Sequence, residues 1–154
     1  MQRFEKVLAV RSRALGVARK LDWLPLLLVR LSLAAVFVPS GWGKLHDLEK
    51  VTGFFTELGI PAPHLNAVVV AVSELVCGSL LLVGLLSRLA AVPLVISMTI
   101  AIITAKRADL GGVVDLFAVD EFIYVVMAIV MIVIGAGALS VDGLVARRMK
   151  IAKD

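Results

Sequence analysis

The sequence predicts an all-α fold, a four-transmembrane-helix bundle with an N-terminal amphipathic interfacial helix. Of its 154 residues, 60% are hydrophobic and 18% are charged, and the mean hydropathy is +1.01. Soluble domains carry about 25% charged residues, and a chain this short has too little interior to hide so much apolar surface. The apolar residues also form four long segments joined by short polar connections. We therefore expect the lipid bilayer to solvate most of the chain.

The first segment, residues 1–21, predicts a basic amphipathic helix lying in the membrane interface. Its apolar residues recur near helical spacing, and six Lys and Arg residues fill the other faces. A cleaved signal peptide is the weaker interpretation, because charges interrupt the apolar stretch. Residues 22–145 then form the transmembrane domain, and residues 146–154 form a basic cytoplasmic tail.

Trp23 and Trp42 bracket the first predicted span, as aromatic residues at membrane interfaces tend to do. The 19 positions between them correspond to about 28 Å of helix, close to the thickness of the hydrocarbon core. The four predicted spans cover residues 24–39, 65–85, 89–105 and 122–139.

The segments between and after the predicted spans also predict local structure. Residues 45–58 predict a short amphipathic helix at the outer surface, ended by Gly59 and Pro61. Ser87 and Arg88 predict a tight turn, which makes the second and third spans antiparallel neighbours. Ser140 is a candidate N-cap for a short basic helix in the tail.

The distribution of cations predicts the orientation. With both termini in the cytoplasm, the inner side holds six Lys and Arg at the N-terminus, Arg88 and four in the tail, which makes eleven. The outer loops then hold four. Positive residues favour the cytoplasmic side, so we expect a protein of the cytoplasmic (inner) membrane with both termini inside.

Several function classes are disfavoured by the composition. Cys77 is the single cysteine and lies in an apolar segment, so neither a disulfide nor a C-x-x-C redox pair can form within the chain. His46 and His64 lie in the outer loop, which argues against a haem or metal site. The cations gather near the ends beside lipid, with no pattern typical of nucleic-acid binding.

Arg30 and Glu74 are the two charges placed well inside predicted spans. Each costs roughly 2.5–3.5 kcal/mol at the centre of a membrane helix unless it is paired or hydrated. They lie about 10 Å and about 16 Å from the same cytoplasmic boundary, a difference that a long arginine side chain can bridge. We therefore predict an Arg30–Glu74 ion pair or a water-bridged link.

Two interpretations of this pair are open. It either pins the first two helices together, or it forms the polar floor of a ligand cavity. In the second case Lys44 joins the site, although snorkelling to the interface is the simpler expectation for Lys44. Cys77 lies within one turn of Glu74 and is expected to be a small packing residue. The candidate lining residues are Phe37, Gly41, Cys77, Gly78, Glu121 and Tyr124.

Four segments in order resemble the DoxX family of small bacterial membrane proteins. They are RLSLAAVFVPSGWGKL at 30–45, FFTELGIPAP at 54–63, ELVCGSLLLVGLLSRLAA at 74–91 and GAGALSVDGL at 135–144. The chain departs from the family pattern at Ser79, where a glycine often stands, and in its longer basic N-terminal helix. The resemblance implies a four-helix bundle similar to subunits of thiosulfate:quinone oxidoreductase or to partners of redox and thiol-stress enzymes.

The leading hypothesis is a membrane subunit of a quinone-linked oxidoreductase or thiol-stress complex, in which Arg30, Lys44 and Glu74 bind quinone or relay protons. The alternative is a non-catalytic scaffold whose buried charges only hold the bundle together. A transporter is the weaker third possibility, since the chain shows no repeats. No intrinsic cofactor is expected. The expected partners are membrane lipid and another redox subunit, and a homo-oligomer is left open.

Overall fold

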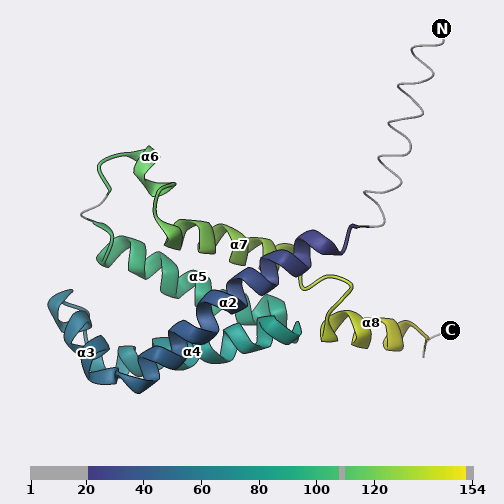
Figure 1. Ribbon diagram of the computed structural model, residues 1–154, viewed down its shortest axis with the longest axis horizontal. Coiled ribbons are helices and arrows are strands. Elements are labelled where there is room, and N and C mark those ends of the chain that lie inside the picture. Colours follow the sequence, from purple (N-terminus) through teal and green to yellow (C-terminus); the bar gives the residue numbers. More distant parts are fainter. Residues whose placement is uncertain (1–20, 108–109, 152–154) are drawn as a thin grey trace, which may run out of the picture.

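The computed structural model describes residues 21–107 and 110–151, and every regular element within them is a helix (Figure 1). The amphipathic helix expected over residues 1–21 lies almost entirely outside this part of the chain. The helices are α2 (Leu24–His46), α3 (Leu48–Glu57), α4 (Pro63–Val83), α5 (Ser87–Thr104), α6 (Val113–Leu116), α7 (Asp120–Ile134) and α8 (Val141–Ile151).

Three of these helices are long and apolar enough to cross a bilayer. Helices α2, α4 and α5 contain 23, 21 and 18 residues, which correspond to about 34, 31 and 27 Å of helix against a hydrocarbon core of about 30 Å. The all-helical expectation is confirmed, with three candidate spans. Helix α7 has only 15 residues, so the fourth span stays a prediction.

Three predicted boundaries are wrong. The first span continues past Pro39 to His46, because neither the proline nor the glycines that follow it end the helix. The turn between α4 and α5 lies at residues 84–86 instead of at Ser87 and Arg88, which begin α5. The turn uses left-handed backbone at Gly84 (φ 74°) and at Leu86 (φ 50°). A non-glycine residue in this region is strained, so surrounding contacts must hold Leu86 in place.

The last predicted span also ends early. Helix α7 stops at Ile134 instead of Leu139, because Gly135 adopts φ 90° and leaves the helix. The tail helix α8 begins after Ser140, whose Oγ accepts a hydrogen bond from the Gly143 N–H at 3.0 Å. This is the expected N-cap.

The short helix expected over residues 45–58 is confirmed as α3. The Asp47 side chain accepts a hydrogen bond from the Lys50 N–H at 3.3 Å and caps its first turn. Gly59 follows the helix with φ 69°, a backbone conformation that glycine adopts without strain.

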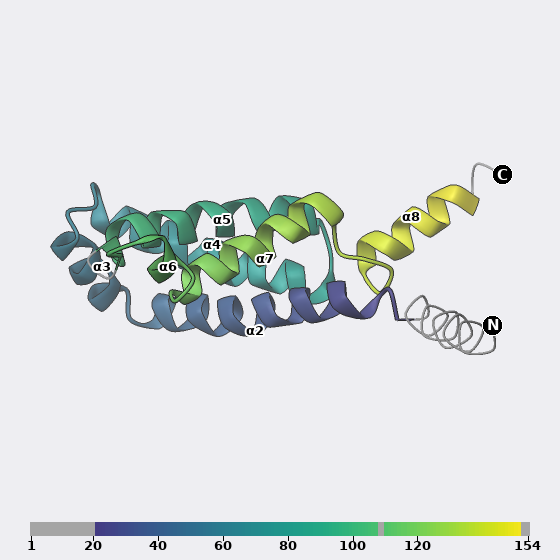
Figure 2. The same ribbon diagram turned by 90° about the horizontal axis from the view of Figure 1, so that it is seen from above.

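The helices pack as an elongated bundle with two distinct ends. Helix α2 lies along α4, α4 lies beside α5, and α5 lies along α7. Figure 2 shows α3 and α6 together at one end, with α8 at the other. We call these the α3 end and the α8 end. The core between them includes Leu33, Phe37, Leu81, Leu94 and Met131.

Helices α2 and α4 approach so closely that two positions require glycine. A Cβ atom on Gly41 would lie 2.4 Å from the backbone nitrogen of Leu75 and 2.7 Å from the carbonyl oxygen of Ala71. A Cβ atom on Gly78 would lie 3.0 Å from the backbone nitrogen of Val38. Small residues of this kind allow membrane helices to pack backbone to backbone.

We expect Gly41→Ala to destabilise the protein, because the added methyl group meets backbone atoms that cannot move without separating the two helices. Overpacking of this kind costs roughly 1–3 kcal/mol, which thermal unfolding in detergent would detect. Gly43→Ala is the matched control, since a Cβ atom there meets nothing within 4 Å. Equal unfolding temperatures for the two variants would contradict the close packing.

Candidate functional site

Arg30 and Glu74 do not form the predicted ion pair. Glu74 instead pairs with Lys44, which lies on the same helix as Arg30 but more than three turns closer to the α3 end. The prediction is wrong because Arg30 lies beside Gly84 and Ala136, whereas Glu74 lies beside Ser40 and Lys44, nearer the α3 end. The arginine is held at the opposite end, and the snorkelling expected for Lys44 is also wrong.

Three side chains form a polar cluster between α2 and α4. Ser40 and Lys44 lie one turn apart on α2, and the Ser40 Oγ donates a hydrogen bond to Glu74 Oε2 at 2.8 Å. Lys44 Nζ donates to Ser40 Oγ at 2.8 Å and also to Glu74 Oε2. Glu74 is 1% exposed, whereas the Lys44 side chain is 27% exposed. The lysine therefore links a fully buried carboxylate to the margin of the bundle.

Ser40 was missed from the sequence, although one signal pointed to it. It lies four residues before Lys44, and residues at this spacing share a helix face. The close contact at Gly41 and Gly78 then brings this face against Glu74, which lies between the levels of the two glycines. The close packing of α2 on α4 thus positions all three polar side chains.

One oxygen of Glu74 remains without a partner. Among the described residues, nothing donates a hydrogen bond to Glu74 Oε1, which is buried. Glu74 lines a cavity of about 620 Å³ at the α3 end of the bundle. A buried carboxylate oxygen costs free energy when it is left unsatisfied, so this atom is suited to a hydrogen-bond donor that enters the cavity.

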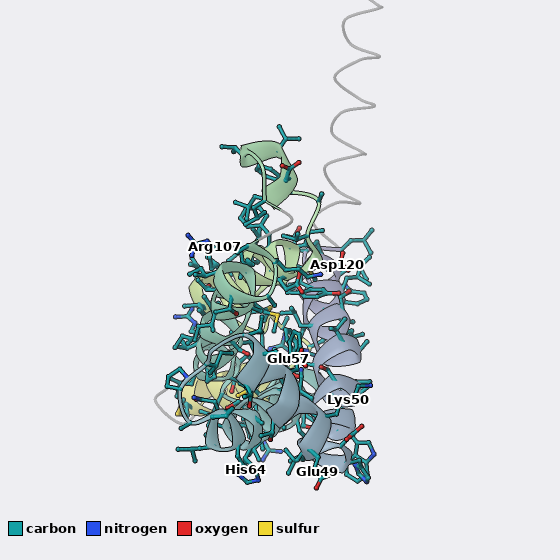
Figure 3. The ribbon with its side chains drawn as sticks, turned by 90° about the vertical axis from the view of Figure 1, so that its left-hand side faces the viewer. Glu49, Lys50, Glu57, His64, Arg107 and Asp120 are labelled. Carbon is teal, nitrogen blue, oxygen red and sulfur yellow. The ribbon has the colours of Figure 1, made fainter. Side chains whose placement is uncertain are left out.

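The cavity combines apolar walls with a few polar groups. Phe37 and Tyr124 meet edge to face with ring centroids 5.7 Å apart, and both line the cavity. Lys106 and Glu121 also line it, from the connection after α5 and from the start of α7. Figure 3 looks onto this end, where charged side chains such as Glu57 and Arg107 surround the helices. This arrangement can accommodate an apolar molecule that has a polar head.

Arg30 belongs to a separate cluster at the α8 end. The arginine is 4% exposed, and its Nη1 donates a hydrogen bond to the carbonyl oxygen of Ala136 at 3.3 Å. A Cβ atom on Gly84 would lie 2.4 Å from Nη1, so glycine leaves the space that the guanidinium fills. Asp142 supplies the nearby negative charge.

Asp142 also caps a helix from a distant part of the chain. Its Oδ1 accepts a hydrogen bond from the Leu86 N–H at 2.8 Å, and its Oδ2 accepts one from the Ser87 N–H at 3.0 Å. These bonds hold the strained turn before α5 and satisfy amide groups that lack acceptors within the helix. The role of this cluster is to join α2, α5 and the loop before α8.

The other candidate residues predicted from the sequence fall into two groups, those that line the large cavity and those buried between helices. Phe37, Glu121 and Tyr124 lie at the wall of the large cavity. The remaining three candidates are buried and do not line the cavity: Gly41 on α2, and Cys77 and Gly78 on α4.

The sequence of α2 to α5 matches a known family model. The family model for DoxX matches residues 25–107, which is more than half of the chain. The chain belongs to the DoxX family. This match includes Arg30, Ser40, Lys44 and Glu74, so both ends of the α2–α4 pair lie within the DoxX region.

One curated relative is described as a membrane protein. The uncharacterized membrane protein Rv3486 of Mycobacterium tuberculosis (strain ATCC 25618 / H37Rv) is 42% identical over 87 residues. The aligned part covers 54% of this chain and 53% of that protein, so the chain spans about half the length of the curated relative. No solved structure matches the chain.

A double-mutant cycle tests the Lys44–Glu74 pair. Lys44→Met leaves a buried carboxylate without its cation, and breaking such a pair costs about 3 kcal/mol or more. We expect the double variant Lys44→Met/Glu74→Gln to recover part of this loss in unfolding measurements. Lys50→Met is the matched control, because Lys50 is exposed on α3. Additive effects of the two substitutions would exclude a coupled pair.

Asp142→Ala removes the cap on α5 and the negative charge near Arg30. Loss of a helix cap typically costs about 1 kcal/mol, and we expect at least this decrease in the free energy of unfolding. Hydrogen exchange of the Leu86 and Ser87 amides should accelerate. Glu49→Ala, which removes an exposed carboxylate at the α3 end, should change neither measurement.

Proposed function

We propose that this DoxX protein is a four-span subunit of the inner membrane that binds a quinone in the cavity at the α3 end. Helix α7 with its flanking residues would be the fourth span, and the cation distribution places both termini in the cytoplasm. The α3 end would then face the outer side. The observation that carries the proposal is the free oxygen of buried Glu74 at the wall of a largely apolar cavity.

The shape and polarity of the cavity suit a quinone. A quinone has a flat ring with polar oxygens and an apolar tail, and binding pockets for such ligands are mostly apolar with a few placed polar groups. Phe37 and Tyr124 offer aromatic surface for the ring. Glu74 Oε1 would accept a hydrogen bond from the hydroxyl of the reduced ligand.

The polar cluster also suits proton transfer. Reduction of a quinone to a quinol takes up two electrons and two protons, and a partner redox subunit would supply the electrons. Glu74 would pass the two protons one at a time from water to the quinone oxygens, while Lys44 and Ser40 hold its carboxyl group in position. Arg30 has no part in this proposal, because its contacts lie at the α8 end.

A non-catalytic scaffold is the second candidate. Helix α6 and the residue that follows it expose apolar side chains to the surroundings, with Val113 78%, Val114 81% and Phe117 65% exposed. Such a group at the α3 end would suit contact with a partner subunit. In that case the Lys44–Glu74 pair would serve only to hold α2 against α4.

Quinone binding separates the two candidates. We expect the full-length protein, purified in detergent, to bind a short-chain ubiquinol or menaquinol in an equilibrium titration. Glu74→Gln should weaken quinol binding about tenfold, which corresponds to 1.4 kcal/mol and fits the loss of one charge-assisted hydrogen bond. Glu49→Gln is the control, because it makes the same change on an exposed surface of the same end.

A second variant keeps the test independent of the ion pair. Ala101→Phe places a large side chain in the cavity wall without changing any charge, and it should also reduce binding. Quinol binding that is unchanged in both variants would reject the cavity as the site. Absence of binding to the folded wild-type protein would reject the quinone function and favour the scaffold.

A further inference from the structure

A second cavity lies at the α8 end of the bundle. It has a volume of about 500 Å³ and lies between the first turn of α5 and the loop that joins α7 to α8. It shares no lining residue with the larger cavity at the α3 end. Arg88 is the one cation in its wall, and its neighbours there include Leu86, Leu89 and Ile134.

Arg88 is positioned by the loop but keeps most of its hydrogen-bonding capacity. Its Nη2 donates to the carbonyl oxygen of Ile134 at 3.3 Å, its one hydrogen bond within the described residues. A Cβ atom on Gly135 would lie 3.2 Å from Nε, so glycine leaves room beside the guanidinium. The remaining N–H groups are available to an anion, and guanidinium groups bind phosphate oxygens well.

The backbone adds further donors on the same wall. Helix α5 begins at Ser87, so the amides of Arg88 and Leu89 have no acceptor within the helix. Asp142 occupies the preceding amides of Leu86 and Ser87 with both carboxylate oxygens. Asp142 also lines this cavity, but backbone amides occupy both of its oxygens, so Arg88 is the charged residue of the wall that keeps free hydrogen-bonding groups.

The rim of the cavity is apolar and exposed. Leu86 is 53% exposed, Leu89 68% and Ile134 56%. These residues lie at the end of α4, α5 and α7, where a membrane-spanning bundle meets the lipid head groups. A free phosphate ion would gain nothing from this rim, whereas a phospholipid would place its acyl chains against it.

We propose that this cavity binds one anionic phospholipid, with the phosphate on Arg88 and the acyl chains against Leu86, Leu89 and Ile134. The bound lipid would join α5 to the loop before α8. This site is independent of the quinone proposal, since the two cavities lie at opposite ends of the bundle.

Native mass spectrometry of the full-length protein tests the site. We expect the wild-type protein to retain one phosphatidylglycerol in preference to phosphatidylcholine. Arg88→Gln should reduce that retention about tenfold, as expected for loss of a charge-assisted contact worth 1.4 kcal/mol. Arg147→Gln is the matched control, because it removes an exposed cation from α8 at the same end. It should reduce retention less than twofold.

Two further measurements distinguish binding of a phospholipid from binding of a small phosphate compound. Glycerol 3-phosphate supplies the phosphate without acyl chains, and we expect it to bind far more weakly than phosphatidylglycerol. Leu89→Ser keeps the charge of Arg88 and should reduce lipid retention even if Arg88→Gln fails to fold. Equal losses in the Arg88 and Arg147 variants would overturn the proposal. Equal binding of glycerol 3-phosphate or unchanged retention in Leu89→Ser would also overturn it.

Discussion

The backbone contact between α2 and α4 is the constraint on which the rest of the structure depends. Gly41 and Gly78 let the two helices meet without intervening side chains. This proximity brings Lys44 and Ser40 of one helix onto Glu74 of the other. In a low-dielectric interior an isolated carboxylate is costly, and a paired one is tolerated. The glycines therefore make the buried charge possible, and the charge in turn fixes the register of the helices.

The two ends of the bundle use their buried charges differently. At the α8 end, Arg30 and Asp142 engage backbone groups and hold together segments that lie far apart in the sequence. At the α3 end, the Lys44–Glu74 pair lies beside an open cavity, and one carboxylate oxygen has no hydrogen-bond donor among the described residues. A cluster that served packing alone would be expected to use both oxygens, as Asp142 does. This difference separates a structural cluster from a candidate binding site.

The fold could be predicted from the sequence to the level of helices and their order. Long apolar segments must be helical in lipid, because every backbone polar group needs a partner within its own segment. The pairing of charges could not be predicted in this way. Arg30 and Glu74 were matched by depth alone, but the partners depend on which helix faces meet and on the irregular loop at 135–140. That loop brings the Ala136 carbonyl to Arg30, and periodicity carries no information about it.

The direction of the Lys44 side chain determines which groups of the site are left to bind a ligand. A lysine that snorkelled to the interface would leave the buried Glu74 carboxyl group without its cation. The lysine instead points inward and, together with Ser40, contacts Glu74 Oε2. The other oxygen, Oε1, is then the one left for a hydrogen bond beside the cavity, since no described residue donates to it. A ligand with a hydroxyl group, such as the proposed quinol, would supply that hydrogen bond.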